Sequence, residues 1–313
     1  MITLGIIGMN EGNGHPFSYS SIFNGYDPIA LERDCSFELI KKYLPAEHRN
    51  KNFIRDAKVT HIWTQEKRIS ELLSNVALIP NIVDNMEDLI GEVDAVILAR
   101  DDPWNHLEMA LPFIKKRIPI FIDKQLSSTK EDLLEFKRIL SPDYPIMACS
   151  SSRYTRDIAD LRKKNILHHT KTVHGVSRVN WMRYGHHLLE GICSIVGTNV
   201  KFVKSLPAKP GHEIMQIVYS DGLNLLFEFI TDISLPIQFT CYSSKFTPKV
   251  VPFTDYFNSF KKMMENFVTL VKTGKKDIEI DEIISIASIV LAGDISMKNN
   301  GIAISPTTLR EIK

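Results

Sequence analysis

The 313-residue chain lacks three features that would place it in a specialised class of protein. Its four cysteines have no C-x-x-C spacing, which disfavours a structural zinc site and a disulfide framework. No apolar run is long enough to span a bilayer. The net charge is only +1, so no overall field favours nucleic acid or an anionic membrane as a partner. These absences leave a small molecule as the expected partner.

The amino terminus also lacks the features of a signal peptide. Residues 1–4 carry no basic segment, and they continue directly into an apolar run. Cysteines among apolar neighbours act as small hydrophobic residues and suit a reducing compartment. The chain is 44% hydrophobic and 24% charged, which is an ordinary composition for a globular protein in water. We therefore expect a cytoplasmic protein.

A glycine-rich phrase follows the first predicted strand, at residues 2–7, and reads Gly8-Met9-Asn10-Glu11-Gly12-Asn13-Gly14-His15-Pro16. Dinucleotide-binding sheets hold a pyrophosphate at such a turn, because glycine lets backbone N–H groups approach the phosphate. The G-x-G-x-x-G pattern would place glycines at 8, 10 and 13, so Asn10 and Asn13 make the match weak by itself. The candidate phosphate-facing residues are Gly8, Asn10, Gly12 and Asn13.

Strand-like and helix-like segments alternate through the first half of the chain. The apolar and β-branched runs predict strands at 59–64, 93–99, 119–122 and 144–148. The periodicity between them predicts helices at 65–75, 105–116 and 129–139. This alternation predicts right-handed crossovers and a doubly wound parallel sheet. Residues 17–56 exceed one crossover helix, and we interpret them as an insertion that covers the site or contacts another subunit.

The pattern changes near residue 150. Strand-like runs follow one another without helices between them, at 200–206, 212–219, 224–231 and 237–243. Such runs predict a mostly antiparallel sheet. Further periodic segments predict a strand at 171–179 and helices at 184–196, 257–273 and 280–299. We expect a dinucleotide-binding domain at 1–150 and a substrate and oligomerisation domain at 151–313.

Polar residues follow several of the predicted parallel strands directly. The carboxyl ends of such strands face the ligand crevice, which makes Glu66, Arg100, Asp123 and Lys124 candidate site residues. Lys124 would donate to a substrate hydroxyl or to a ribose, although an ordinary exposed lysine is the commoner explanation of its position alone. Glu66 would bind the ribose hydroxyls of NAD. The basic residues that follow it at 67 and 68 would attract the extra phosphate of NADP, so these residues allow either NAD or NADP as the cofactor.

The predicted helix at 184–196 carries a histidine and a carboxylate at a productive spacing. His187 and Glu190 are three residues apart and share a face of the helix. A carboxylate beside an imidazole orients it and raises its basicity, which suits general acid–base work. A surface ion pair or a buried structural histidine would have the same spacing. His186 points about 100° around the helix. The spacing is not H-E-x-x-H, so we expect no metal site.

Together these residues resemble the glucose-fructose oxidoreductase / inositol 2-dehydrogenase family (Gfo/Idh/MocA) over nearly the whole chain. Asp123-Lys124-Gln125 is similar to the family's Glu-Lys-Pro segment. Gly185, His187 and Glu190 resemble its G-x-H-x-x-D stretch. The resemblance implies an α/β protein with an N-terminal Rossmann domain and a C-terminal α/β domain whose sheet is open and mostly antiparallel. It also implies a homo-oligomer, either a dimer or a tetramer.

The resemblance further implies an oxidoreductase that uses NAD or NADP to transfer a hydride from a sugar, polyol or sugar nucleotide. Lys124 would polarise the reacting oxygen, His187 would accept its proton and Glu190 would orient His187. Tyr184 is a substitute proton donor. The candidate residues of the substrate wall are Arg153, Trp181, Arg183 and His186.

Three positions depart from the family pattern. Asparagines replace two glycines of the first loop, Gln125 replaces the proline, and Arg183 stands where many members have an aspartate. An arginine at this position would bind an anionic group of the substrate. The departures keep two further hypotheses open. One is a non-catalytic or regulatory ligand-binding protein of the same fold, and the other is a lyase that uses NAD on a sugar substrate.

Overall fold

The computed structural model describes residues 1–49 and 52–311, which form two compact units built from interleaved segments. The segments of the first unit are Met1–Lys124, Ile139–Ala148 and Tyr256–Ile280. Those of the second unit are Gln125–Arg138, Cys149–Asp255 and Asp281–Lys313. The chain therefore enters each unit more than once.

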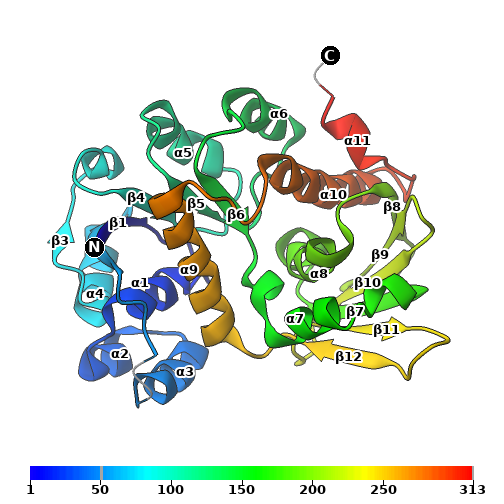
Figure 1. Cartoon of the computed structure of the whole chain (residues 1–313), viewed down its shortest axis with the longest axis horizontal. Coiled ribbons are helices and arrows are strands. Elements are labelled where there is room, and N and C mark those ends of the chain that lie inside the picture. Colours follow the sequence, from blue (N-terminus) through cyan, green and yellow to red (C-terminus); the bar gives the residue numbers. More distant parts are fainter. Residues whose placement is uncertain (50–51, 312–313) are drawn as a thin grey trace. The chain divides into compact units, whose positions relative to one another are not determined.

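The first unit contains a six-stranded parallel sheet in the order β3-β2-β1-β4-β5-β6 (Figure 1). Its strands are β1 (Ile2–Ile7), β2 (Ala57–Trp63), β3 (Asn81–Ile82), β4 (Ala95–Leu98), β5 (Ile120–Asp123) and β6 (Ile146–Cys149). The order reverses between β1 and β4, so the topological switch point, where doubly wound sheets bind ligands, lies between these two strands. The predicted doubly wound parallel sheet is confirmed.

Three helices connect β1 to β2. They are α1 (His15–Asn24), α2 (Pro28–Asp34) and α3 (Glu38–Arg49). Helices α1 and α2 pack against α4 (Lys67–Ala77), which follows β2. The insertion expected at 17–56 therefore consists mainly of these helices and the short loops between them, and residues 50 and 51 lie outside the described residues. Its role as a cover or a subunit contact stays a prediction.

Helix α9 (Tyr256–Thr273) packs against the first sheet although it follows the second sheet in the chain (Figure 1). Right-handed crossovers place α1 and α4 on one face and α5 (His106–Lys115) on the other, which leaves β5 without a crossover helix on the α1 face. Phe267 of α9 contacts Phe121 of β5, with ring centroids 5.9 Å apart. Phe260 contacts Tyr19 of α1 at 5.4 Å. Helix α9 therefore supplies the aromatic cover that the crossovers leave out.

The second unit contains a six-stranded mixed sheet in the order β12-β11-β7-β10-β9-β8 (Figure 1). Its strands are β7 (Thr172–Arg178), β8 (Val200–Leu206), β9 (His212–Tyr219), β10 (Asn224–Ile230), β11 (Gln238–Tyr242) and β12 (Lys249–Pro252). Only the β7–β10 pair is parallel among these strands, as the structure describes them. The predicted open, mostly antiparallel sheet is confirmed.

Two long helices of the second unit pack on one face of this sheet. These two helices are α8 (Trp181–Val196) and α10 (Ile280–Lys298). The shorter helices are α6 (Lys130–Ile139), α7 (Arg156–Lys163) and α11 (Pro306–Leu309). The indole N–H of Trp181 donates to the carbonyl of Val290 on α10 at 2.8 Å. The same ring contacts Phe229 of β10, with centroids 5.7 Å apart. Trp181 therefore joins both helices to the sheet.

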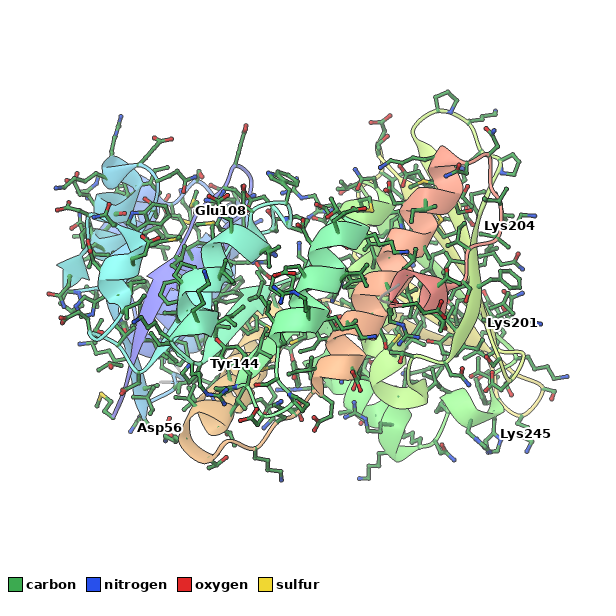
Figure 2. All side chains as sticks on the ribbon, turned by 90° about the horizontal axis from the view of Figure 1, so that it is seen from above. Asp56, Glu108, Tyr144, Lys201, Lys204 and Lys245 are labelled. Carbon is green, nitrogen blue, oxygen red and sulfur yellow. The ribbon has the colours of Figure 1, made fainter. Side chains whose placement is uncertain are left out.

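Strand β8 forms one edge of this sheet, and the edge is partly covered. Lys201 and Lys204 project from β8 toward solvent (Figure 2). Ile304 pairs with Val203 through two backbone hydrogen bonds of 2.9 Å. Lysines and a short covering segment both discourage pairing of an edge strand with another chain. Among the described helices, none is long and apolar enough to cross a membrane.

We predict that Gly293→Ala destabilises the second unit, because Trp181 lies in a slot between two glycines. A Cβ at Gly293 would lie 2.4 Å from the indole Nε1, and one at Gly185 would lie 2.5 Å from Cε3. Overpacking of a filled core typically costs about 1–3 kcal/mol. Urea denaturation measures the free energy of unfolding. The matched control is Gly191→Ala on α8, whose Cβ would lie 2.9 Å from the flexible tip of Ile158 and 3.3 Å from Cζ of Phe253. Equal losses in the two variants would contradict the prediction.

Candidate active site

Asn10 links the loop after β1 to the loop after β4. Its side-chain N–H donates to Oδ1 of Asp101 at 2.6 Å, and its side-chain oxygen accepts the backbone N–H of Asp101 at 3.0 Å. Because β1 and β4 flank the switch point, this pair of hydrogen bonds spans the place where a doubly wound sheet binds its ligand. A glycine at position 10 has no side chain and would make neither of these two hydrogen bonds across the switch point.

The other predicted loop residues have distinct settings. A Cβ at Gly8 would lie 2.7 Å from Cγ of Pro16, so packing requires the glycine. Gly12 is exposed and has φ +76°, a left-handed conformation that favours glycine. Asn13 is buried, and its side-chain oxygen accepts the N–H of His15 at 2.8 Å. Asn13 therefore holds the loop together from inside.

The loop offers a group of backbone donors. Within the part of the chain that the structure describes, no hydrogen-bond partner is present for the N–H groups of Met9, Asn10, Glu11, Gly12 and Gly14. Consecutive N–H groups in such a turn can bind phosphate oxygens. This donor set fits the pyrophosphate of a dinucleotide.

Asp123, the last residue of β5, is buried and accepts several hydrogen bonds. Its Oδ1 accepts the N–H of Lys124 at 2.8 Å and lies 3.5 Å from the hydroxyl of Tyr19. Its Oδ2 pairs with Nδ1 of His15 in a short hydrogen bond and lies 3.5 Å from Nδ2 of Asn13. The carboxylate therefore connects β5 with the loop after β1 and with α1.

The side chain of Lys124 is also buried. Its Nζ lies 3.4 Å from Oδ2 of Asp101, which balances its charge. The interpretation of Lys124 as an ordinary exposed lysine is therefore wrong. The arrangement links Lys124, through Asp101, to Asn10 in the loop after β1. A buried lysine with one carboxylate partner at the carboxyl edge of a parallel sheet is suited to binding a ligand oxygen.

The two remaining cofactor candidates differ in exposure. Arg100 is buried, ion-paired with Asp102, and donates to Oε1 of Gln65 at 2.8 Å. The Gln65 amide in turn donates to the carbonyl of Met9 at 2.7 Å, so Arg100 braces the loops from within the protein. Glu66 is exposed and makes no side-chain hydrogen bond at the start of α4. Its carboxylate can accept bonds from a ligand.

His187 of the second unit is half-buried and held by two neighbours. Its Nδ1 lies 2.6 Å from Oγ of Ser150, which follows β6. Its ring contacts that of Tyr184 edge-on, with centroids 5.4 Å apart. Asn180 caps the helix by accepting the N–H of Arg183 at 2.9 Å, which sets where α8 begins. Sequence reasoning missed Ser150, whose only signal was its position after a predicted strand.

The prediction that Glu190 orients His187 was wrong. Oε2 of Glu190 accepts from Nε2 of His186 at 2.8 Å, and Oε1 accepts from Nε of Arg153 at 2.6 Å. The i,i+4 neighbour rather than the i,i+3 neighbour faces Glu190, because both side chains point into the interior of the unit. Burial alone would raise the pKa of Glu190, but the charge of Arg153 and the hydrogen bond from His186 hold it below the ordinary value.

Several predicted substrate-wall residues lie in the interior. Trp181 is fully buried, and Arg153 is ion-paired with both Glu190 and Glu282. Burial alone would lower the pKa of Arg153, but the two carboxylates raise it. These two residues therefore brace the unit and do not form a wall. His186 is buried as well, whereas Arg183 is exposed. No group of three metal-binding side chains is present among the described residues.

We predict that Glu190→Gln lowers the free energy of unfolding at neutral pH. The variant's free energy of unfolding should also change less than that of the wild type as the pH falls. Breaking one side of a buried ion pair typically costs about 3–5 kcal/mol. The lowered pKa means that the contribution of Glu190 is complete above the carboxyl's ordinary pKa and is lost as the pH falls through the folded-state value. Urea denaturation at several pH values measures both effects.

The matched control for this prediction is Glu282→Gln. Glu282 binds the same guanidinium, but its side chain is 28% exposed, so water can replace part of the interaction. We expect a smaller loss of stability than in the Glu190 variant. An acid dependence of Glu190→Gln that equals that of the wild type would contradict the assignment.

Comparisons with known proteins identify the fold. No family model matches the chain, and no curated protein matches it. A putative myo-inositol dehydrogenase from Sinorhizobium meliloti 1021 has a TM-score of 0.74 and 12% identity, over 97% of this chain and 99% of that chain. A myo-inositol dehydrogenase from Lactobacillus casei, in complex with NAD(H) and myo-inositol, has a TM-score of 0.75 and 11% identity, over 97% of both chains. A probable dehydrogenase from Thermotoga maritima has a TM-score of 0.69 and 15% identity, over 98% of this chain and 100% of that chain. At such identities the likeness establishes a shared fold.

Proposed function

We propose that this protein is an NAD(P)-dependent oxidoreductase that oxidises a CH–OH group of a sugar, polyol or sugar nucleotide. The observation that carries the proposal is the carboxyl edge of the first sheet. There several N–H groups of the loop at residues 8–14 have no partner within the described chain, and the loop is linked, through Asn10 and Asp101, to the buried Lys124. The shared fold with a dehydrogenase in complex with NAD(H) and myo-inositol supports the same function.

The loop and Glu66 are the proposed nucleotide-binding groups. The loop N–H groups would bind the pyrophosphate, and Glu66 would accept the ribose hydroxyls. Lys67, which would favour the extra phosphate of NADP, lies 3.6 Å from Asp84. We therefore propose NAD as the preferred nucleotide. The nucleotide would supply the hydride acceptor, while the protein supplies binding and proton transfer.

The proposed roles of the remaining residues follow the family resemblance. Lys124 would donate a hydrogen bond to the reacting oxygen, and His187 would accept a hydroxyl proton. Ser150 fixes the ring of His187, and Tyr184 is its neighbour. The exposed Arg183 would bind an anionic group of the substrate.

A second candidate function is ligand binding without catalysis. The Asn10–Asp101 hydrogen bonds favour it, because they occupy the switch point where the nucleotide would pass. A lyase that holds NAD tightly is the third candidate. Nucleotide recovered from denatured protein would support the lyase.

We also propose a homo-oligomer, dimer or tetramer, that assembles on the face of the second sheet opposite α8 and α10. This face carries half-buried apolar side chains, at Val176, Ile214, Val218, Leu226 and Ile230. Light scattering after size-exclusion chromatography measures the molar mass.

All four cysteines are buried free thiols, in keeping with the cytoplasmic location that we propose.

We predict that the wild-type protein binds NADH saturably, because the loop at residues 8–14 presents free donors. Quenching of tryptophan fluorescence and a thermal shift measure the binding. Gly12→Val should weaken it at least tenfold, since φ +76° is strained for a β-branched residue and the side chain would crowd the loop. The control is Gly25→Val, which has the same φ but lies at the far end of α1. No response to either NADH or NADPH would refute the oxidoreductase and favour the ligand-binding protein.

We predict that Lys124→Met and His187→Asn each lower turnover by about 10²–10⁴-fold, the range typical of a lost proton-transfer or polarising group. Initial rates with NAD⁺ and a panel of inositols, hexoses and sugar nucleotides measure this effect. If both residues act on one bound substrate, the double variant should lose less than the product of the two single losses. Lys115→Met, at the exposed end of α5, is the control and should keep full activity. Wild-type rates in either site variant would contradict its assigned role.

A further inference from the structure

We infer that His15 is a further proton-transferring residue of the proposed site and that Asp123 holds it for this task. The inference rests on the proposed function, because it supplies an acid–base group for the same reaction. The sequence provided no motif for His15, which lies at the end of the glycine-rich phrase.

The ring of His15 is held on three sides. Its Nδ1 pairs with Oδ2 of Asp123. One face stacks on Tyr19 of the same helix, with centroids 5.1 Å apart, and Phe260 of α9 approaches edge-on at 5.3 Å. The side chain of His15 is 21% exposed, whereas that of Asp123 is 1% exposed. The imidazole is therefore fixed but reachable by a ligand.

The hydrogen bond to Asp123 determines which ring nitrogen is available. A carboxylate accepts a proton but cannot donate one, so Nδ1 carries the hydrogen and Nε2 is left with a free lone pair. Nε2 has no hydrogen-bond partner among the side chains and backbone groups that the structure describes. A carboxylate that orients an imidazole in this way also stabilises the imidazolium that forms when Nε2 takes up a proton. The hydroxyl of Tyr19 lies 3.5 Å from Oδ1 of Asp123, and Lys124, the next residue, donates its backbone N–H to the same oxygen.

The surroundings of His15 distinguish it from the other histidine–carboxylate pairs of the described chain. His186 and Glu190 form a buried pair that solvent does not reach. His174 and His212 share Glu228 on the open face of the second sheet. Only the pair of His15 and Asp123 lies at the carboxyl edge of the parallel sheet, and its carboxylate belongs to the residue before Lys124.

The proposed step balances with an oxidised nicotinamide as the electron acceptor. The C–H bond of the substrate breaks, and its hydrogen leaves with both electrons to the nicotinamide. The O–H bond of the hydroxyl on that carbon breaks, and its proton passes to Nε2 of His15, which replaces His187 as the proton acceptor in this inference. The substrate becomes a carbonyl compound, and the imidazolium stays paired with Asp123. In the reverse direction the imidazolium returns the proton to the carbonyl oxygen.

The first test separates turnover from nucleotide binding in His15→Ala and His15→Gln. We expect NADH affinity within about threefold of wild type, but turnover lower by about 10²-fold or more, as for loss of a general base. Turnover is measured with NAD⁺ and the same panel of inositols, hexoses and sugar nucleotides. Added imidazole should restore part of the activity of His15→Ala, which a merely structural role would not allow. The control is His168→Gln, which removes an exposed histidine of the second unit and should keep full turnover.

Two results of this test would overturn the inference. Turnover of His15→Ala within about threefold of wild type would show that no proton passes through His15. Parallel loss of NADH binding and turnover in both variants, with circular dichroism unchanged, would show that His15 is a nucleotide ligand instead.

The second test needs neither nucleotide nor substrate. Nitrogen-15 spectra of the imidazole rings show which nitrogen carries the hydrogen, and His15→Gln assigns the signal. We expect the Nδ1–H form in the wild type and a shift toward the Nε2–H form in Asp123→Ala. An Nε2–H form in the wild type would overturn the inference. If the wild type binds no NADH, the proposed function fails, and this spectrum still decides the arrangement of His15 and Asp123.

Discussion

The buried carboxylate of Asp123 is the group on which the candidate site depends. A carboxylate removed from water is stable only when hydrogen bonds or opposite charges compensate its lost hydration. Asp123 obtains these bonds from Lys124, His15, Tyr19 and Asn13, which come from the end of β5, the loop after β1 and the start of α1. The need to satisfy one charge therefore draws two segments together, the end of β5 and the stretch from the loop after β1 into α1. Helix α9 covers the same region with Phe260, so the aromatic packing and the polar network support each other.

The second unit uses a similar arrangement for a different purpose. Glu190, Arg153 and His186 satisfy one another in the interior, and Trp181 fills the slot between α8 and α10. Because these groups are buried and bonded mainly to one another, they stabilise α8 from inside the unit. The half-buried His187, which is carried on the same helix, keeps contact with Ser150 and Tyr184. A buried polar cluster thus supports His187, the residue that we propose as a proton acceptor, at its boundary.

The asparagines of the first loop replace glycines without disturbing the sheet order. Asn13 turns inward and bonds to His15, while Asn10 turns across the switch point to Asp101. Side-chain amides therefore shape a turn that glycines shape in the G-x-G-x-x-G pattern. Gly12 retains the left-handed conformation that the turn needs, and the free N–H groups around it remain. The loop keeps the backbone donors that we propose for phosphate binding, and it is connected to Lys124 through Asp101.

Much of the fold was predictable because its signals are local. Apolar runs at β1 and β4 and the alternation along β10 follow from which side chains avoid water. The location of Lys124 at the crevice edge follows from its place after a strand. The two-residue β3 and the four-residue β12 carry too little periodicity to be found. The pairing of side chains was not predictable. Glu190 binds His186 and not His187, and Asp123 binds His15 from 108 residues away, because long-range packing decides which polar groups are buried together. The sequence by itself determined the sheets and the candidate lysine, and only the tertiary structure decided the hydrogen-bond partners.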